Sequence, residues 1–316
     1  MSILFLAGLA LVVLGADWLV EGASSVARRA GLSEFVIGLT IVGMGTSAPE
    51  MVVSVLGALE GNGDIAVGNV VGSNIFNTLL ILGLTALILP IGITSSNRRR
   101  DIPVNIAVTL LLLFLGLERT FFGVGTDGLS RIDGAVLLAI FIVYMWISFA
   151  RGKSLPEESE PGHAPMKLWL AVLMILGGLA ALVIGGNLFV DNATGIASRL
   201  GISDKFIAVT ILAGGTSLPE LATCVTAAVK KKGQLALGNI IGSNIFNILL
   251  ILGSASVIAP VSFQSINLVD MGALLVSALA LLGSLAVGKK NSVDRLDGSL
   301  FLLIWAAYMA YLIINL

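Results

Sequence analysis

Charged residues, cysteine and histidine are scarce in this sequence. Asp, Glu, Lys and Arg make up only 12% of the 316 residues, whereas a soluble domain carries roughly 25%. The chain has one cysteine, Cys224, and one histidine, His163. A single cysteine excludes a disulfide framework, and so few sulfur and imidazole groups argue against a zinc site built by this chain alone. Oxygen atoms remain as the candidate ligands.

Hydrophobic residues are abundant instead, at 57% of the sequence, and the mean hydropathy is +1.02. A helix needs about 20 apolar residues to cross a membrane, and the long continuous runs do not resemble the short alternating strands of a β-barrel. The first run lacks the basic region of a signal peptide, so it counts as a span. The sequence predicts an all-α integral membrane protein with ten transmembrane helices: Ile3–Val20, Phe35–Leu59, Ile65–Leu89, Ile102–Leu117, Asp133–Phe149, Lys167–Val190, Phe206–Val229, Leu235–Ala259, Leu268–Val287 and Leu296–Ile314.

Two polar motifs each occur twice, at the same spacing. GTSAPE (Gly45–Glu50) precedes GNVVGSNIFN (Gly68–Asn77), and GTSLPE (Gly215–Glu220) precedes GNIIGSNIFN (Gly238–Asn247). A shift of 170 residues superimposes them, and 16 of the 26 residues at positions 65–90 match their counterparts. The sequence therefore predicts two repeats of five spans, residues 1–150 and 167–316, joined by a linker at 151–166.

An odd number of spans per repeat means that the second repeat enters the membrane from the opposite side. Cytoplasmic loops are enriched in Lys and Arg, and only four of the 18 such residues lie outside the loops that follow odd-numbered spans: Arg119, Arg131, Arg199 and Lys205. We therefore expect inverted repeats in the inner (plasma) membrane of the cell. Both termini would be extracytoplasmic and the linker cytoplasmic.

Inverted repeats are typical of secondary transporters, which bind their substrates near the midplane between the repeats. An ionisable residue at that depth indicates a functional site, and Glu50 and Glu220 are equivalent residues of this kind. Residues three and four apart share a helix face, so Thr46 and Ser47 accompany Glu50. Thr216 and Ser217 likewise accompany Glu220.

Each proline of these motifs removes a backbone donor and clashes with the carbonyl group four residues earlier. This frees the carbonyl groups of Gly45 and Gly215 and disturbs those around Gly43 and Ala213. The second motifs add Ser73 with Asn77, and Ser243 with Asn247. Hard cations such as calcium take about six to eight oxygen ligands. Two carboxylates balance one divalent ion, and sodium ions that share these carboxylates would compete with calcium, which is sufficient for antiport.

The paired motifs resemble the alpha-repeats of the calcium/cation antiporter superfamily, close to prokaryotic sodium/calcium exchangers. The resemblance covers nearly the whole chain. It implies ten helices and alternating access, in which the first and sixth helices slide across the others. The ions would lie between the second, third, seventh and eighth helices.

By the same resemblance, calcium ligands are expected at Glu50, Glu220, Thr46 and Thr216. Sodium would bind both glutamates and a further set: Ser47, Ser217, Ser73, Ser243 and the carbonyl groups of Gly43 and Ala213. Asn77 fits the pattern, whereas Asn247 stands where some members carry Asp. The transported calcium and sodium ions and membrane lipid are the expected partners, without cofactor or nucleic acid, and a monomer is expected to suffice for transport.

Three alternatives to sodium/calcium exchange stay open. A proton/calcium exchanger could use the same glutamates, because buried carboxyl groups titrate. A cation channel could also present oxygen ligands. Gly61 to Asp64 matches the GxGD pattern of intramembrane aspartyl proteases, although the equivalent Lys232-Gly233-Gln234 lacks the Asp.

Overall fold

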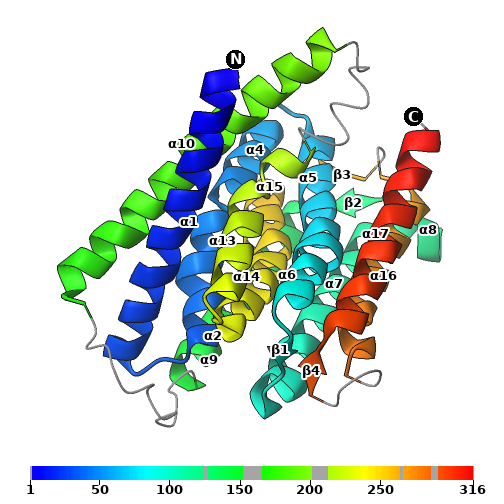
Figure 1. Cartoon of the computed structure of the whole chain (residues 1–316). Coiled ribbons are helices and arrows are strands. Elements are labelled where there is room, and N and C mark those ends of the chain that lie inside the picture. Colours follow the sequence, from blue (N-terminus) through cyan, green and yellow to red (C-terminus); the bar gives the residue numbers. More distant parts are fainter. Residues whose placement is uncertain are drawn as a thin grey trace.

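The computed structural model describes residues 2–123, 127–151, 166–200, 213–263, 266–285 and 291–315, and nearly all of them are helical (Figure 1). Residues 152–165 of the predicted linker, including His163, and 206–212 of the predicted seventh span lie outside these ranges. The helices of the first half are α1 (Ser2–Ala30), α2 (Glu34–Ile37), α3 (Gly43–Thr46), α4 (Ala48–Leu59), α5 (Gly63–Ile75), α6 (Leu82–Ile88), α7 (Ile102–Gly116), α8 (Glu118–Phe122) and α9 (Arg131–Arg151).

The second half of the chain contains the remaining described helices. Its helices are α10 (Leu168–Arg199), α12 (Ala213–Gly215), α13 (Leu218–Val229), α14 (Gly233–Phe246), α15 (Gly253–Ile258), α16 (Leu268–Gly283) and α17 (Arg295–Ile314). Wider π-helical turns interrupt or precede several helices, at η1 (Gly38–Val42), η2 (Phe76–Ile81), η3 (Asn97–Asp101) and η5 (Asn247–Leu252).

Among the described residues, six helical segments are long and apolar enough to cross a membrane. They are Ile3–Ala30, Gly63–Ile88, Arg131–Ala150, Leu168–Arg199, Gly233–Ile258 and Arg295–Ile314, and a seventh is added if the bent segment 34–59 counts as one span. The remaining predicted spans correspond to the shorter helices α7, α13 and α16. The protein is therefore a mostly helical membrane protein with several apolar spans.

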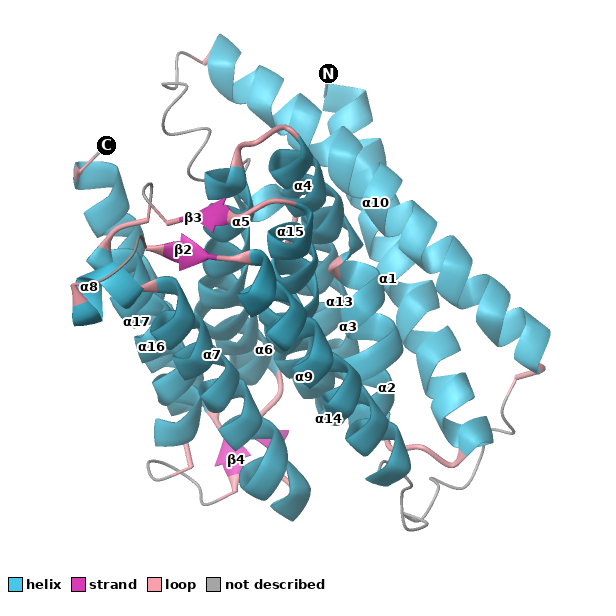
Figure 2. Cartoon of the chain, turned by 180° about the vertical axis from the view of Figure 1, so that it is seen from behind, coloured by secondary structure: helices cyan, strands magenta, loops and turns pink. Residues whose placement is uncertain are grey.

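The two longest helices, α1 and α10, lie side by side and lean across the other helices (Figures 1 and 2). Glycines let their backbones approach closely, as is common between membrane helices. A Cβ added at Gly15 would lie 2.8 Å from the carbonyl oxygen of Gly178, and one at Gly185 would lie 2.8 Å from that of Gly8. Because α1 packs mainly against α10, these two helices form a distinct pair beside the remaining bundle.

Salt bridges connect α1, one of these two helices, to the bundle. Lys230, directly after α13, pairs with Asp17 at 2.6 Å and with Glu21 at 2.9 Å, both on α1. Lys232 contacts Glu21 at 3.3 Å. The positions equivalent to these lysines are Glu60 and Asn62, which cannot form the same pairs with α10.

Two short antiparallel strand pairs connect the two halves. β1 (Ile91–Gly92) of the first half pairs with β4 (Ser292–Val293) of the second. β2 (Gly128–Leu129) of the first half pairs with β3 (Val261–Ser262) of the second. Figure 2 shows the two pairs at opposite ends of the helical bundle. α14 and η5, which lie between these ends, carry an almost unbroken series of buried residues.

Candidate cation-binding site

In each of the two TS-x-PE motifs, the carboxylate lies in the first turn after a break in the helix. At Ser47 (φ −81°, ψ 9°) α3 ends and α4 begins, and the axis bends by 48°. Pro49 occupies the first turn of α4, where its missing amide proton leaves no bond unmade. Glu50 follows in the same turn, and the positive end of the helix dipole favours a carboxylate there.

The second half has the same arrangement. Ser217 (φ −87°, ψ 8°) precedes α13, Pro219 lies at its start and Glu220 lies in its first turn. Both glutamates are only 1% exposed. The sequence analysis expected each proline to disturb the preceding turn within one continuous span, and in the structure one helix ends and the next begins there.

Serines from opposite halves exchange hydrogen bonds with these two glutamates. Ser47 Oγ donates to Glu220 Oε1 at 2.9 Å, and Ser217 Oγ donates to Glu50 Oε1 at 3.0 Å. In each half, Ser73 or Ser243 makes a longer contact of 3.4 Å with the nearer glutamate. The structure therefore joins six of the predicted site residues in two equivalent clusters, each of which draws on both halves. One contains Ser47, Glu220 and Ser243, and the other contains Ser217, Glu50 and Ser73.

Four oxygens in this region are buried but have no hydrogen-bond partner in the described part of the chain. They are Oε2 of Glu50 and of Glu220, and Oδ1 of Asn77 and of Asn247. A buried oxygen without a partner costs roughly 1–3 kcal/mol, and more if it is charged. Each of these atoms can act as a ligand, and an all-oxygen set suits a hard cation.

No salt bridge neutralises either glutamate within the described residues. The two carboxylates also interact electrostatically with each other. Two buried like charges are unfavourable without a compensating positive charge. The site therefore requires bound cations or protons.

The amide groups of Asn77 and Asn247 are held by two asparagines that the sequence reasoning did not single out. Asn77 Nδ2 donates to Asn244 Oδ1 at 3.2 Å, and Asn247 Nδ2 donates to Asn74 Oδ1 at 2.8 Å. These bonds cross between α5–η2 and α14–η5. They use the amide donors, which leaves both Oδ1 atoms free to face a cation. The duplication of Asn74 within the second motif was the available signal.

The two threonines lie differently from the serines. Thr46 Oγ1 donates to Asn239 Oδ1 at 3.1 Å, and Thr216 Oγ1 lies 3.5 Å from Asn69 Oδ1. Neither asparagine was among the predicted ligands, although both belong to the duplicated motif. The threonine hydroxyl groups therefore contact asparagines of the other half, and they also interact with the glutamates of the other half, Thr46 with Glu220 and Thr216 with Glu50.

The two predicted carbonyl ligands, Gly43 and Ala213, each lie four residues before a serine of the clusters. The carbonyl oxygen of Gly43 accepts the backbone N–H of Ser47 at 3.1 Å and lies 3.5 Å from Ser243 Oγ. Ala213 begins α12, four residues before Ser217. Asp64, the catalytic residue of the protease alternative, lies in the first turn of α5 and forms none of the described hydrogen bonds of the network.

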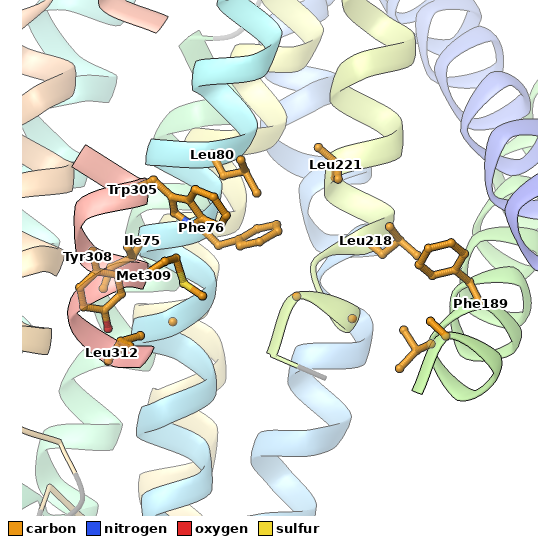
Figure 3. A pocket seen from close by; sticks show the side chains of 15 residues that line it. Ile75, Phe76, Leu80, Phe189, Leu218, Leu221, Trp305, Tyr308, Met309 and Leu312 are labelled. Carbon is orange, nitrogen blue, oxygen red and sulfur yellow. The ribbon is translucent and has the colours of Figure 1, made fainter. Parts of the chain in front are cut away.

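A largely apolar cavity of about 470 Å³ opens beside the site (Figure 3). Its lining comes from α5–η2, α10, α12–α13 and α17 and includes the backbone of Gly214 and Gly215, next to Thr216. Phe76 and Trp305 border it with ring centroids 6.4 Å apart.

The equivalent place in the other half is filled. There Phe246, the counterpart of Phe76, is buried and packs edge-to-face on Phe141 at 5.4 Å. The two halves therefore share one sequence pattern but differ in packing beside the site.

Comparisons with known proteins agree over nearly the whole chain. A family model described as sodium/calcium exchanger protein matches residues 1–150 and 170–314. The putative antiporter CaxA of Alkalimonas amylolytica is 41% identical over 97% of this chain and 97% of its own length. The sodium/calcium exchanger MaX1 of Methanosarcina acetivorans is 31% identical over 98% of this chain and 97% of its own.

Solved structures of the sodium–calcium exchanger NCX_Mj have a similar fold. One of them superimposes with a TM-score of 0.84 at 36% sequence identity, covering 98% of this chain and 99% of that one. The similarity extends through both halves and includes the helices that carry the two glutamates.

Proposed function

Because the chain belongs to the sodium/calcium exchanger protein family, we propose that it exchanges sodium ions for calcium ions across a membrane. The chain is an integral membrane transporter rather than an enzyme. The observation that carries the proposal is the reciprocal network in which Ser47 donates to Glu220 and Ser217 donates to Glu50. Each glutamate is thereby held by a serine of the other half, and its second oxygen is left to bind an ion.

Calcium binds in this proposal between Glu50 and Glu220, whose two negative charges balance one divalent ion. The hydroxyl and carbonyl groups of Thr46 and Thr216 complete the calcium ligands. Sodium ions use the same glutamates together with Ser47, Ser73, Ser217, Ser243, Asn77, Asn247 and the carbonyl groups of Gly43 and Ala213. A full set of sodium ions and a calcium ion then cannot occupy the site together, which couples their movements.

The chain crosses the membrane ten times in this proposal, as two inverted repeats of five helices with the ions near the midplane. The reciprocal hydrogen bonds and the two reciprocal strand pairs support an approximate two-fold relation between the halves. The distribution of Lys and Arg supports termini on the extracytoplasmic side of the inner (plasma) membrane.

Alternating access arises from movement of the α1–α10 pair over the bundle. Two observations support this. The pair is tightly joined by its glycines. Its α10 helix lines an open cavity at α12–α13, whereas Phe246, the counterpart of the lining residue Phe76, is buried against Phe141. If the two halves exchanged these packing arrangements, the site would open to the opposite side of the membrane.

Calcium flux into proteoliposomes tests the proposal. We expect vesicles loaded with sodium to accumulate radioactive calcium when diluted into sodium-free buffer, and to lose this uptake when the sodium gradient is removed. Calcium uptake that ignores the sodium gradient would contradict the proposal.

Proton/calcium exchange is the second candidate, because two buried carboxylates without a basic partner can hold protons. A pH gradient imposed without sodium separates the two functions. Under sodium/calcium exchange, this gradient drives no calcium uptake.

A further inference from the structure

Asn69 on α5 and Asn239 on α14 form equivalent bridges between the two broken helices. Asn239 is fully buried, and its Nδ2 donates to Cys224 Sγ on α13 at 3.3 Å. Its Oδ1 accepts from Thr46 Oγ1, at the end of α3, at 3.1 Å. Each bridge therefore connects the glutamate helix of its own half to the threonine of the other half.

The mirror bridge is looser. Asn69 Nδ2 donates to Ser54 Oγ at 3.1 Å and to the Glu50 carbonyl oxygen at 3.2 Å, both on α4. Its Oδ1 lies 3.5 Å from Thr216 Oγ1, and Asn69 is only partly buried.

A hydroxyl group has one proton and two lone pairs. When it coordinates a cation, its proton must point away from the ion, toward an acceptor. Asn239 Oδ1 makes the shorter of the two described hydrogen bonds of Thr46 Oγ1, at 3.1 Å against 3.4 Å for the Gly43 carbonyl oxygen. The Glu220 carboxylate also interacts with Thr46, but the proposed function assigns that carboxylate to the cation. Because the amide group of Asn239 donates a hydrogen bond to Cys224 Sγ, the orientation of its acceptor oxygen is restricted.

We propose that Asn239, and less strongly Asn69, are positioning residues that orient the hydroxyl groups of Thr46 and Thr216 so that their lone pairs face the transported cation. This inference rests on the proposed function, because it assigns the two threonines as ligands. Neighbours that orient ligand groups typically change metal affinity by about 10- to 100-fold when they are removed. The shorter and more buried contact at Asn239 predicts the larger effect there.

A double-mutant cycle on the purified full-length protein tests the inference, with calcium binding measured by isothermal titration calorimetry. Asn239→Leu removes the acceptor at similar volume, and Thr46→Val removes the hydroxyl group. We expect each single change to raise the calcium dissociation constant by roughly 10-fold or more. In the Thr46→Val background, Asn239→Leu should add less than about twofold, because contacting residues act non-additively. An equal effect of Asn239→Leu in both backgrounds would overturn the inference, as would an unchanged dissociation constant in the single variant.

Two matched controls separate this role from a purely structural one. Asn192→Leu replaces an asparagine on α10 whose side chain, among the described residues, bonds to its own helix at Leu188 O, and should leave calcium affinity unchanged. Thr46→Ser keeps the hydroxyl group and should restore the affinity that Thr46→Val loses. If Asn239→Leu does not fold, this threonine pair still decides, since equal binding by Thr46→Ser and Thr46→Val would overturn the inference.

Flux assays on the same variants keep the inference separate from the proposed function. We expect Asn239→Leu to raise KM for calcium while kcat changes by less than about threefold. Wild-type protein that binds calcium without sodium-driven flux would contradict the proposed function alone. An additive cycle in a protein that exchanges normally would contradict the positioning role alone.

Discussion

Glu50 and Glu220 each accept one strong serine hydrogen bond through Oε1 and leave Oε2 buried without a described partner. The equivalence of the two positions means that neither glutamate alone provides the site. A neutral glutamine keeps the shape of the side chain, but it removes the charge and replaces one oxygen by a donor group that repels a cation.

We therefore predict that Glu50→Gln and Glu220→Gln each reduce sodium-driven calcium uptake by at least 100-fold, since about half the charge that balances calcium is lost. Radioactive calcium flux in proteoliposomes measures this. Glu60→Gln is the matched control, because Glu60 is exposed at the end of α4, and it should retain nearly normal uptake. Retention of uptake by either site variant would show that the two glutamates are not both required.

At the scale of helices, α1 and α10 approach closely because glycines without side chains lie at their contact. Gly185 and Gly186 are neighbours on α10 and provide a matched pair. A Cβ at Gly185 would meet the Gly8 carbonyl oxygen and the Val12 nitrogen at 2.8 Å, whereas a Cβ at Gly186 meets nothing within 4 Å.

We predict that Gly185→Ala destabilises the protein by about 1–3 kcal/mol through overpacking, while Gly186→Ala is neutral or slightly stabilising because it adds helix propensity. Thermal unfolding of the purified variants in detergent measures the difference. Equal transition temperatures would contradict the close packing of α1 on α10.

The ion pairs of Lys230 with Asp17 and Glu21 connect α1 to the end of α13 on one side only. If α1 slides during transport, these pairs favour one of the two access states. A partly exposed ion pair contributes about 0–1 kcal/mol, so Lys230→Gln should change the ratio of calcium KM values on the two membrane faces by up to about fivefold.

Flux measured in both directions checks this prediction. Lys231→Gln is the control, since Lys231 is exposed and belongs to none of the described salt bridges. An identical KM ratio in Lys230→Gln and wild-type protein would exclude any role of these pairs in the balance between states.

For the whole molecule, the inverted arrangement predicts that equivalent helix ends lie on opposite sides of the membrane. Glu60 ends α4 and Lys231 follows α13, and both are exposed. The only native cysteine, Cys224, is fully buried, so it does not interfere with labelling of introduced cysteines.

We predict that Glu60→Cys is labelled by an impermeant maleimide from the extracytoplasmic side and Lys231→Cys from the cytoplasmic side. Intact cells and inverted membrane vesicles provide the two sides. Labelling of both positions from the same side would contradict the inverted topology.

Much of this organisation follows from the sequence, because duplication preserved the residues on which it depends. The prolines of the paired motifs predicted a disturbed backbone before Pro49 and Pro219, where the structure has helix breaks. The apolar runs predicted the helices long and apolar enough to cross a membrane. The motifs also contain the four serines and two glutamates that the structure joins in two equivalent hydrogen-bonded clusters. Their role as ion ligands remains a prediction.

Two features could not be predicted because they depend on contacts between distant segments. Asn239 is separated from Thr46 by 193 residues. No local sequence pattern shows that Asn239 accepts the hydrogen bond of the Thr46 hydroxyl group. Phe76 and Phe246 stand at equivalent positions in nearly identical sequence, yet one borders a cavity and the other is buried. This difference arises from the packing of the whole molecule rather than from the sequence of either repeat.

Calcium binding as a function of sodium concentration tests most directly whether both halves form one shared site. Equilibrium titration of the purified protein with radioactive calcium should give one high-affinity ion per chain, displaced competitively by sodium and lost in both Glu50→Gln and Glu220→Gln. Calcium binding that persists in either variant, or that sodium does not weaken, would contradict a single site shared by the two repeats.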